Sequence, residues 1–129
     1  ATLHEITPGV DEGPVVAQTR VEYAEDDTGG SLHARVREAE EQLFRDYWPR
    51  VAAGERIPAR AQEAGAGSSH LRREFFALKR EARVREMSGD ELLRLARCLT
   101  FPGFSGLEVA LGRSKFEVRL EPLAPGDEE

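Results

Sequence analysis

The sequence predicts an α/β fold of the α+β type, with short strands near both ends of the chain and helices between them. Three patterns support this class. Apolar and polar residues alternate in two short runs before residue 23, apolar residues recur at helical spacing from 32 to 47, and a hairpin pattern covers 107 to 121. A chain of 129 residues with 40% hydrophobic content has the size of one modest domain.

The charge balance and the cysteine content exclude several classes of protein. The formal net charge is −6, and no cluster of Lys and Arg marks a nucleic-acid surface. No run approaches the roughly 20 apolar residues of a membrane span, and the amino terminus lacks the pattern of a secretory signal. We therefore expect a cytoplasmic protein without nucleic-acid or membrane partners. The single cysteine, Cys98, cannot form an internal disulfide, and its apolar neighbours predict a buried side chain.

Two strands and a long helix are predicted in the first half of the chain. Residues 1 to 6 alternate as a strand without any lead-in, so we expect the chain to enter in mid-fold, and a second strand follows at 14 to 23. Pro49, with Gly54 and Pro58 after it, predicts that the helix stops near Trp48 or soon after. Thr28 or Ser31 can cap this helix. Its apolar face contains Leu32, Val36, Ala39, Leu43 and Tyr47 and is expected to pack on a sheet.

The second half of the chain begins with a loop at 55 to 70, followed by a short helix around 75 to 78 that leads into an extended piece. Ser88 and Glu91 form a capping-box pattern that predicts a helix from 89 to 99, with Met87 and Leu92 as its apolar staple. Residues 107 to 111 and 116 to 122 predict two strands around the four residues 112 to 115.

The loop at residues 7 to 14 carries the most specific signal. Asp11 lies between Gly9 and Gly13, in a turn where the backbone can approach a flat ligand closely. Judged from the turn alone, such an aspartate is more often a turn residue that binds its own backbone. The three histidines have no metal-ligand spacing, so no metal site is predicted.

Three stretches, taken in order, make this sequence resemble the formyltetrahydrofolate-dependent formyltransferases. They are HEITPGVDEGPVVAQ at 4 to 18, AEDDTGGSLHARVREAEEQLF at 24 to 44 and LTFPGFSG at 99 to 106. In the resemblance Asp11 occupies the place of the catalytic aspartate, and His4 matches a histidine found in several branches. The resemblance further implies a cofactor-binding role for Thr7, Pro8, Gly9, Val10 and Gly13. The other matching residues are Asp27, Thr28, Ser31, Leu32, Thr100, Phe101, Pro102 and Gly106.

The resemblance implies an activity, a cofactor and an acceptor. A member of this family transfers the formyl group of N10-formyltetrahydrofolate to an amine, and a carboxylate helps to move the proton that the amine loses. The chain stops soon after Leu120 with an acidic ending, which favours the branch that formylates a small amine, most often a nucleotide-linked amino sugar. The family's Asn-x-His element is absent, because the 129 residues contain no Asn. We therefore expect the chain to be incomplete alone and its amino-terminal half to be a missing partner.

The expected organisation follows from the same resemblance. Residues 1 to 100 correspond to the carboxy-terminal part of a Rossmann-like catalytic domain with two long helices, and 101 to 121 to a terminal β-hairpin. Residues 122 to 129 form a flexible acidic tail. The hairpin, at 107 to 121, is the expected surface of a homodimer.

Three alternatives stay open. A formyltetrahydrofolate hydrolase shares the D-E-G-P turn, with water in place of the amine, but the TFPGFSG segment argues against it. A methionyl-tRNA formyltransferase would continue into a basic domain. A non-catalytic dimerisation module of this family would retain the helix and the hairpin.

Overall fold

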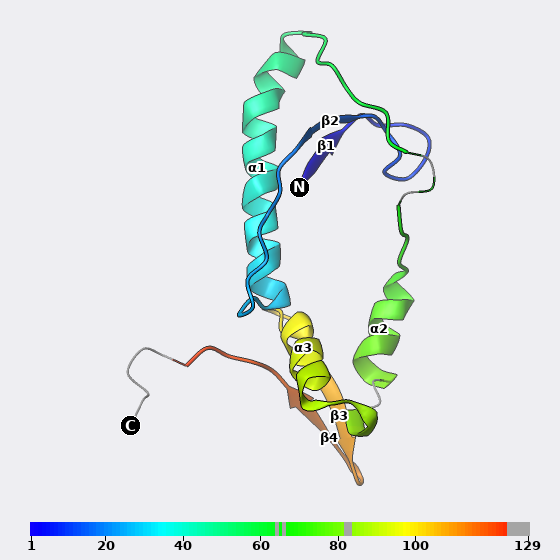
Figure 1. Cartoon of the computed structure of the whole chain (residues 1–129), viewed down its shortest axis with the longest axis vertical. Coiled ribbons are helices and arrows are strands. Elements are labelled where there is room, and N and C mark those ends of the chain that lie inside the picture. The colour runs from blue at the N-terminus through cyan, green and yellow to red at the C-terminus, as the bar shows by residue number, and fades with distance from the viewer. Residues whose placement is uncertain (64, 66, 82–83, 124–129) are drawn as a thin grey trace. The chain divides into compact units, whose positions relative to one another are not determined.

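The structure is a computed structural model that describes residues 1–63, 65, 67–81 and 84–123. The chain forms two compact units. The first comprises Ala1–Tyr23 and His33–Ser69, and the second comprises Ala24–Leu32 and His70–Glu129. Helices and strands both occur, in the order β1, β2, α1, α2, η1, α3, β3, β4 (Figure 1). The predicted mixed α/β class is therefore confirmed.

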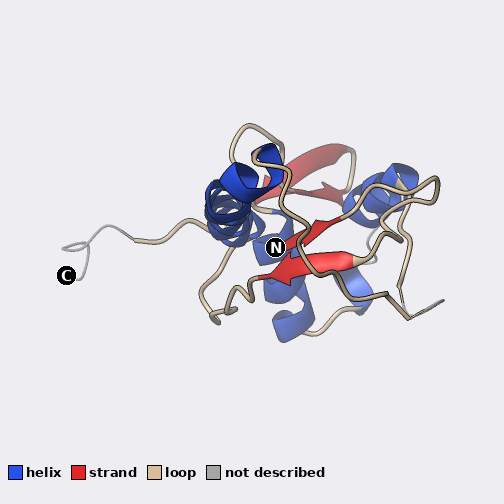
Figure 2. Cartoon of the chain, turned by 90° about the horizontal axis from the view of Figure 1, so that it is seen from above, coloured by secondary structure: helices blue, strands red, loops and turns tan. Residues whose placement is uncertain are grey.

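The first unit contains an antiparallel strand pair near the amino terminus. Strand β1, Thr2–His4, pairs with β2, Val15–Gln18, and the two arrows lie side by side in Figure 2. The second strand is shorter than predicted, because it ends at Gln18 instead of residue 23. The register shifts between Leu3 and His4, which makes a bulge immediately before the loop that follows β1.

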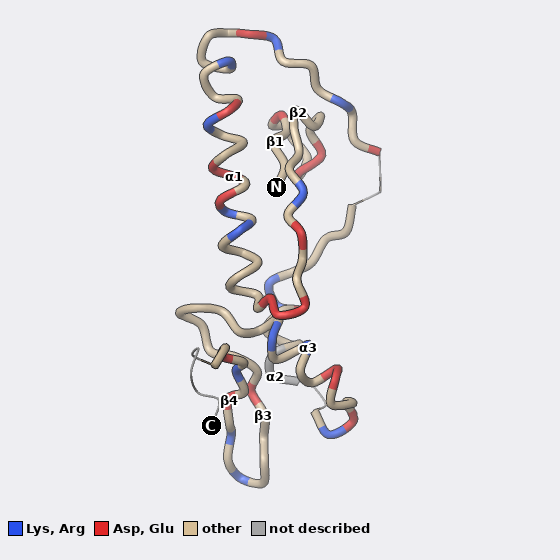
Figure 3. The backbone as a smooth tube through the Cα atoms, turned by 60° about the vertical axis from the view of Figure 1, so that its left-hand side comes forward, with Lys and Arg blue, Asp and Glu red and all other residues tan. Residues whose placement is uncertain are grey.

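Helix α1, Gly29–Ala52, is the longest element, and both predicted capping residues contribute to its start. The Thr28 Oγ1 atom accepts from the Ser31 amide at 3.1 Å, and the Ser31 hydroxyl accepts from the Thr28 amide at 2.9 Å. The Ser31 hydroxyl also donates to the buried Asp27 carboxylate at 2.8 Å. Both acidic and basic residues occur along the helix (Figure 3), and Glu41 and Arg45 form an i, i+4 pair at 3.2 Å.

Helix α1 ends soon after Trp48, as predicted, although it continues through Pro49 to Ala52. A proline inside a helix removes one backbone donor without ending the helix immediately. The end is built by Gly54, which has φ of 74°. The Gly54 amide donates to Val51 O and the Glu55 amide donates to Arg50 O, both at 3.0 Å. This is the bond pattern of a Schellman motif, in which glycine takes the left-handed position.

The second unit contains the remaining helices. Helix α2, Arg72–Glu81, is longer than the predicted 75 to 78, and the short 3-10 helix η1, Val84–Glu86, stands where an extended piece was expected. Helix α3, Gly89–Leu99, has the predicted bounds. Both bonds of its capping box are present, between the Ser88 hydroxyl and the Glu91 amide and between the Glu91 carboxylate and the Ser88 amide.

The predicted carboxy-terminal hairpin is present in the second unit as β3, Leu107–Leu111, and β4, Ser114–Val118. Its connection is two residues shorter than predicted, because Ser114 already pairs with Leu111. Gly112 takes φ of 62° at the first position of this two-residue turn, as a type II′ turn requires. The tail prediction falls largely on residues 124–129, which lie outside the described residues.

The buried core of the second unit lies between α3 and β3. Ala96, Leu99 and Leu107 form its centre. Partly buried residues surround it: Val84, Leu92, Leu95, Val109, Val118 and Leu120. The prediction of a buried Cys98 is wrong, since its side chain is exposed. At 100° per residue, position 98 lies well off the stripe that holds 92, 95, 96 and 99, so helical phase outweighs the apolar neighbours in sequence.

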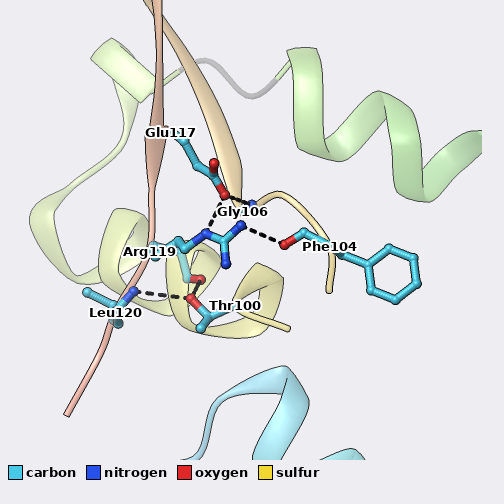
Figure 4. A network of polar contacts seen from close by, with 7 residues as sticks. Thr100, Phe104, Gly106, Glu117, Arg119 and Leu120 are labelled. Atoms are coloured by element: carbon cyan, nitrogen blue, oxygen red, sulfur yellow. Dashed lines mark hydrogen bonds and ion pairs between the residues drawn. The ribbon is translucent and has the colours of Figure 1, made fainter. Parts of the chain in front are cut away.

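The TFPGFSG segment is a corner that ties α3 to the hairpin (Figure 4). The Thr100 hydroxyl donates to Ala96 O at 2.8 Å and accepts from the Leu120 amide at 3.1 Å. The Glu117 carboxylate accepts from the Gly106 amide and from Arg119. Gly106 is buried, and a Cβ there would lie 2.5 Å from Val118 O, so a larger residue does not fit. Two of the four matching residues in this corner therefore have a clear structural role.

No helix among the described residues is long and apolar enough to span a membrane.

Candidate active site

The candidate site is built on the loop that joins β1 to β2 in the first unit. The loop is closed at its base, where the Glu5 amide donates to Pro14 O at 3.0 Å. Asp11 lies near its tip with φ of 56°. Within the described part of the chain, it is the one non-glycine residue in the left-handed region. Aspartate tolerates this conformation better than most residues because its short side chain can bond locally.

The structure brings together the two predicted catalytic residues. The His4 Nε2 atom lies 3.5 Å from the Asp11 Oδ1 atom, although the residues are seven positions apart. The Asp11 side chain is 84% exposed and the His4 side chain 26% exposed. The carboxylate is thus accessible to a ligand, while the imidazole is partly covered.

The second nitrogen of His4 determines how the pair can handle a proton. The Nδ1 atom lies 2.9 Å from the Glu5 carbonyl oxygen, which can only accept, so Nδ1 carries the hydrogen and donates. The Nε2 atom of the neutral ring is then free to accept a proton. Once protonated, Nε2 donates toward the Asp11 carboxylate. The loop therefore places two proton-accepting groups, the His4 Nε2 atom and the Asp11 carboxylate, next to each other.

The two glycines of the loop differ in what surrounds them. A Cβ at Gly13 would lie 1.7 Å from Glu5 O, so the close approach is to the chain's own backbone. A Cβ at Gly9 would lie 2.0 Å from the Glu12 carboxylate, which is the flexible end of a side chain. Gly13 is therefore required for the loop to close, whereas the contact at Gly9 can be relieved by a side-chain rotation.

The remaining residues predicted to bind the cofactor lie on the outer part of the loop. Val10 is exposed, and Ile6, in the same loop, is almost fully exposed. The Thr7 hydroxyl is buried and, among the described residues, lacks a hydrogen-bond partner. Exposed apolar side chains next to an unsatisfied polar group are unusual on a surface that binds only water. These features suit an apolar ligand with polar edges.

Residues 60 to 62, from the segment after α1, contact this loop and were not predicted from the sequence. Val15 and Arg60 exchange two backbone bonds, at 2.7 and 2.8 Å. Gln62 Nε2 donates to Asp11 O at 2.8 Å and to Gly13 O at 2.6 Å. An isolated glutamine in a loop has no distinctive spacing, so only the fold reveals this contact. No group of His, Cys, Asp and Glu in the described ranges is arranged to hold a metal ion.

Comparison with known proteins supports the predicted resemblance. No protein-family model matches the chain. It is 32% identical, over 98% of its length and 54% of the other chain, to the dTDP-4-amino-4,6-dideoxyglucose formyltransferase of Mycobacterium bovis. A crystal structure described as a sugar N-formyltransferase from Mycobacterium tuberculosis matches with a TM-score of 0.81 and 28% identity, over 96% of this chain and 54% of that one.

This chain is related to the sugar N-formyltransferases. A third match is the formyltransferase PseJ from Anoxybacillus kamchatkensis, solved with UDP-4,6-dideoxy-4-formamido-L-AltNAc and tetrahydrofolate. It shares 32% identity and a TM-score of 0.54, over 60% of this chain and 40% of that chain. The chain spans about half the length of the curated relatives that it matches. This coverage is consistent with the predicted carboxy-terminal half of a formyltransferase.

Proposed function

We propose that this chain is the carboxy-terminal portion of an enzyme that moves a formyl group from N10-formyltetrahydrofolate to the amine of a nucleotide-linked amino sugar. The single observation that carries this proposal is the His4 and Asp11 pair, held 3.5 Å apart on the loop where the resemblance places the catalytic aspartate. The sugar substrates in the relatives' names, and the tetrahydrofolate in the PseJ structure, support the choice of acceptor and cofactor.

The residues of the loop fit a folate-type ligand. Thr7, Pro8, Gly9, Val10 and Gly13 would hold the cofactor, and the exposed Val10 side chain would offer it an apolar contact. When bound, N10-formyltetrahydrofolate supplies the formyl carbon. Asp11 would accept the proton that the amine releases, and His4 would share it through Nε2. Groups that stabilise negative charge on the formyl oxygen would come from polypeptide outside this chain, because it contains no Asn.

The surface of α1 supports the proposed incompleteness. Phe44, Trp48 and Val51 lie at spacings of four and three residues and are about half exposed. The Phe44 and Trp48 rings stack on each other, with their centroids 5.4 Å apart. An exposed apolar stripe of this kind favours contact with further protein.

We propose residues 1 to 100 as the catalytic portion and 101 to 121 as the dimerisation hairpin of a cytoplasmic homodimer.

A chimera tests the proposed activity. This chain replaces the aligned part of the mycobacterial dTDP-4-amino-4,6-dideoxyglucose formyltransferase, and the formylated sugar and free formate are measured separately. We expect transfer by the chimera, no transfer by the chain alone, and a fall in kcat of at least about 100-fold in Asp11→Asn. Asp26→Asn, on another exposed loop, is the matched control and should keep the activity.

Each arm of this experiment can contradict the proposal. Robust turnover by the chain alone would show that the site is complete without other polypeptide. Release of formate without formylated sugar would identify a hydrolase instead. A folded chimera in which Asp11→Asn matches the parent would remove Asp11 from the mechanism.

A further inference from the structure

Gln62 bridges two carbonyl groups at the tip of the candidate loop. One nitrogen, Nε2, donates to Asp11 O at 2.8 Å and to Gly13 O at 2.6 Å. Carbonyl oxygens only accept, so the amide must face them with its NH2 group, which has two hydrogens to donate. With the amide reversed, the Gln62 Oε1 atom would face the Asp11 and Gly13 carbonyl oxygens, and none of the three could donate. The chemistry of the partners therefore fixes the orientation of the Gln62 amide.

This contact acts on a residue that needs support. Asp11 has φ of 56°, a conformation that L-residues adopt reluctantly, and its exposed side chain has few neighbours to hold it. Gln62 binds the carbonyl of Asp11 itself and the carbonyl of Gly13, so it fixes the peptide group that follows each of these two residues. The segment bearing Gln62 is in turn anchored by the paired bonds between Arg60 and Val15.

We infer that Gln62 is a positioning residue for Asp11. Its amide holds the loop backbone so that the Asp11 carboxylate stays beside His4 Nε2. Gln62 and Asp11 are 51 positions apart in sequence. The inference rests on the proposed function, in which Asp11 handles the proton. Gln62 itself touches neither the proton nor a substrate, so its contribution is to the geometry of the carboxylate.

Two variants in the chimera distinguish hydrogen-bond donation from simple filling of space. Gln62→Glu keeps the shape but points an oxygen at both carbonyls, whereas Gln62→Leu is apolar and of similar size. If the amide acts by donating, kcat falls about tenfold in Gln62→Leu and further in Gln62→Glu, with each KM changed less than about twofold. If it only fills space, Gln62→Glu is the milder change. Gln42→Leu, which removes an exposed bond to Asp46 on α1, is the matched control.

A double variant adds a readout that a general loss of structure would not reproduce. Gln62→Leu acts through Asp11, so it should lower kcat little further in a protein that already carries Asp11→Asn. Independent losses that multiply would overturn the positioning role, and so would a Gln62→Glu chimera with parental kcat.

Nuclear magnetic resonance of the 129-residue chain tests the same contact without any activity. The amide signals of residues 10 to 13 and the Asp11 coupling constant that reports φ should change in Gln62→Leu and stay in place in Gln42→Leu. Unchanged loop signals in Gln62→Leu would overturn the inference. An inactive parent chimera would instead count against the proposed function, while these signals would still decide whether Gln62 holds Asp11.

Discussion

Replacing Gly13 by alanine tests whether the candidate loop closes by backbone contact. The added Cβ would lie 1.7 Å from Glu5 O and 3.2 Å from His4 Nδ1, whereas an ordinary contact is 3.4 Å or more. The Glu5 carbonyl is backbone, so it cannot rotate away as a side chain can. It must move by about 1.7 Å, and its bond with His4 Nδ1, now 2.9 Å long, is then lost.

The magnitude follows from these two effects. Overpacking a close contact costs about 1 to 3 kcal/mol, and one lost hydrogen bond adds about 1 kcal/mol. We expect Gly13→Ala to lower the free energy of unfolding of the first unit by about 2 to 4 kcal/mol, a large share of the roughly 5 to 15 kcal/mol of a typical domain. His4 should also lose its fixed orientation toward Asp11.

The assay uses urea unfolding followed by the fluorescence of Trp48, the sole tryptophan, which lies in the same unit as Gly13. Gly67→Ala is the control, because a Cβ at Gly67 would have no atom within 4 Å and the residue belongs to the same unit. A Gly13→Ala midpoint equal to that of Gly67→Ala would show that the loop tolerates a side chain there and would refute the argument.

Three further changes test the caps and the corner. Gly54→Ala places a side chain at φ of 74° and should cost about 1 kcal/mol in the Trp48 assay, and no loss would contradict the proposed helix end. The Ser88 amide, and then the Ser88 hydroxyl, lower the pKa of Glu91, so its stabilising effect is complete above about pH 4.5 and is lost as the pH falls through the lowered pKa. Glu91→Gln should therefore be less stable than the parent at pH 7 by calorimetry, and a difference that persists at pH 2 would contradict this account. Thr100→Val removes the partner of the Leu120 amide and should cost about 1 to 2 kcal/mol, with Thr19→Val, at an exposed position, as the control for the change of side chain.

Elements with strong local signals could be predicted from the sequence. The capping box at Ser88 places both its helix and its bonds correctly, because every interaction in it spans three residues. The hairpin was predicted for a similar reason, although Gly112 allowed a tighter turn than expected. The end of α1 falls soon after Trp48, as predicted, and the Schellman motif at Gly54, not Pro49, decides the residue at which the helix ends.

The candidate site could be predicted only in part. The resemblance identified Asp11 and His4, and the structure places them in contact, but their catalytic roles stay a proposal. Gln62 was missed because it contacts Asp11, which lies 51 positions earlier in the sequence. No local sequence pattern encodes a contact over that separation. The exposed Cys98 shows the opposite error, where apolar neighbours in sequence were given more weight than helical phase.

The backbone explains why His4 and Asp11 meet although they are seven positions apart in sequence. At the β1 end, the register shift pairs Leu3 with Ala17 and His4 with Val15, so Val16 is the extra residue of a bulge that re-aims the His4 side chain. At the β2 end, Gly13 lets the chain pass against Glu5 O, and the left-handed Asp11 two residues earlier turns the loop back toward β1. The bulge at Val16 and the left-handed turn at Asp11 together bring His4 and Asp11, seven positions apart, within 3.5 Å of each other. Restoring a regular pair by deleting Val16 should therefore separate His4 from Asp11 even if both residues and the loop sequence are kept.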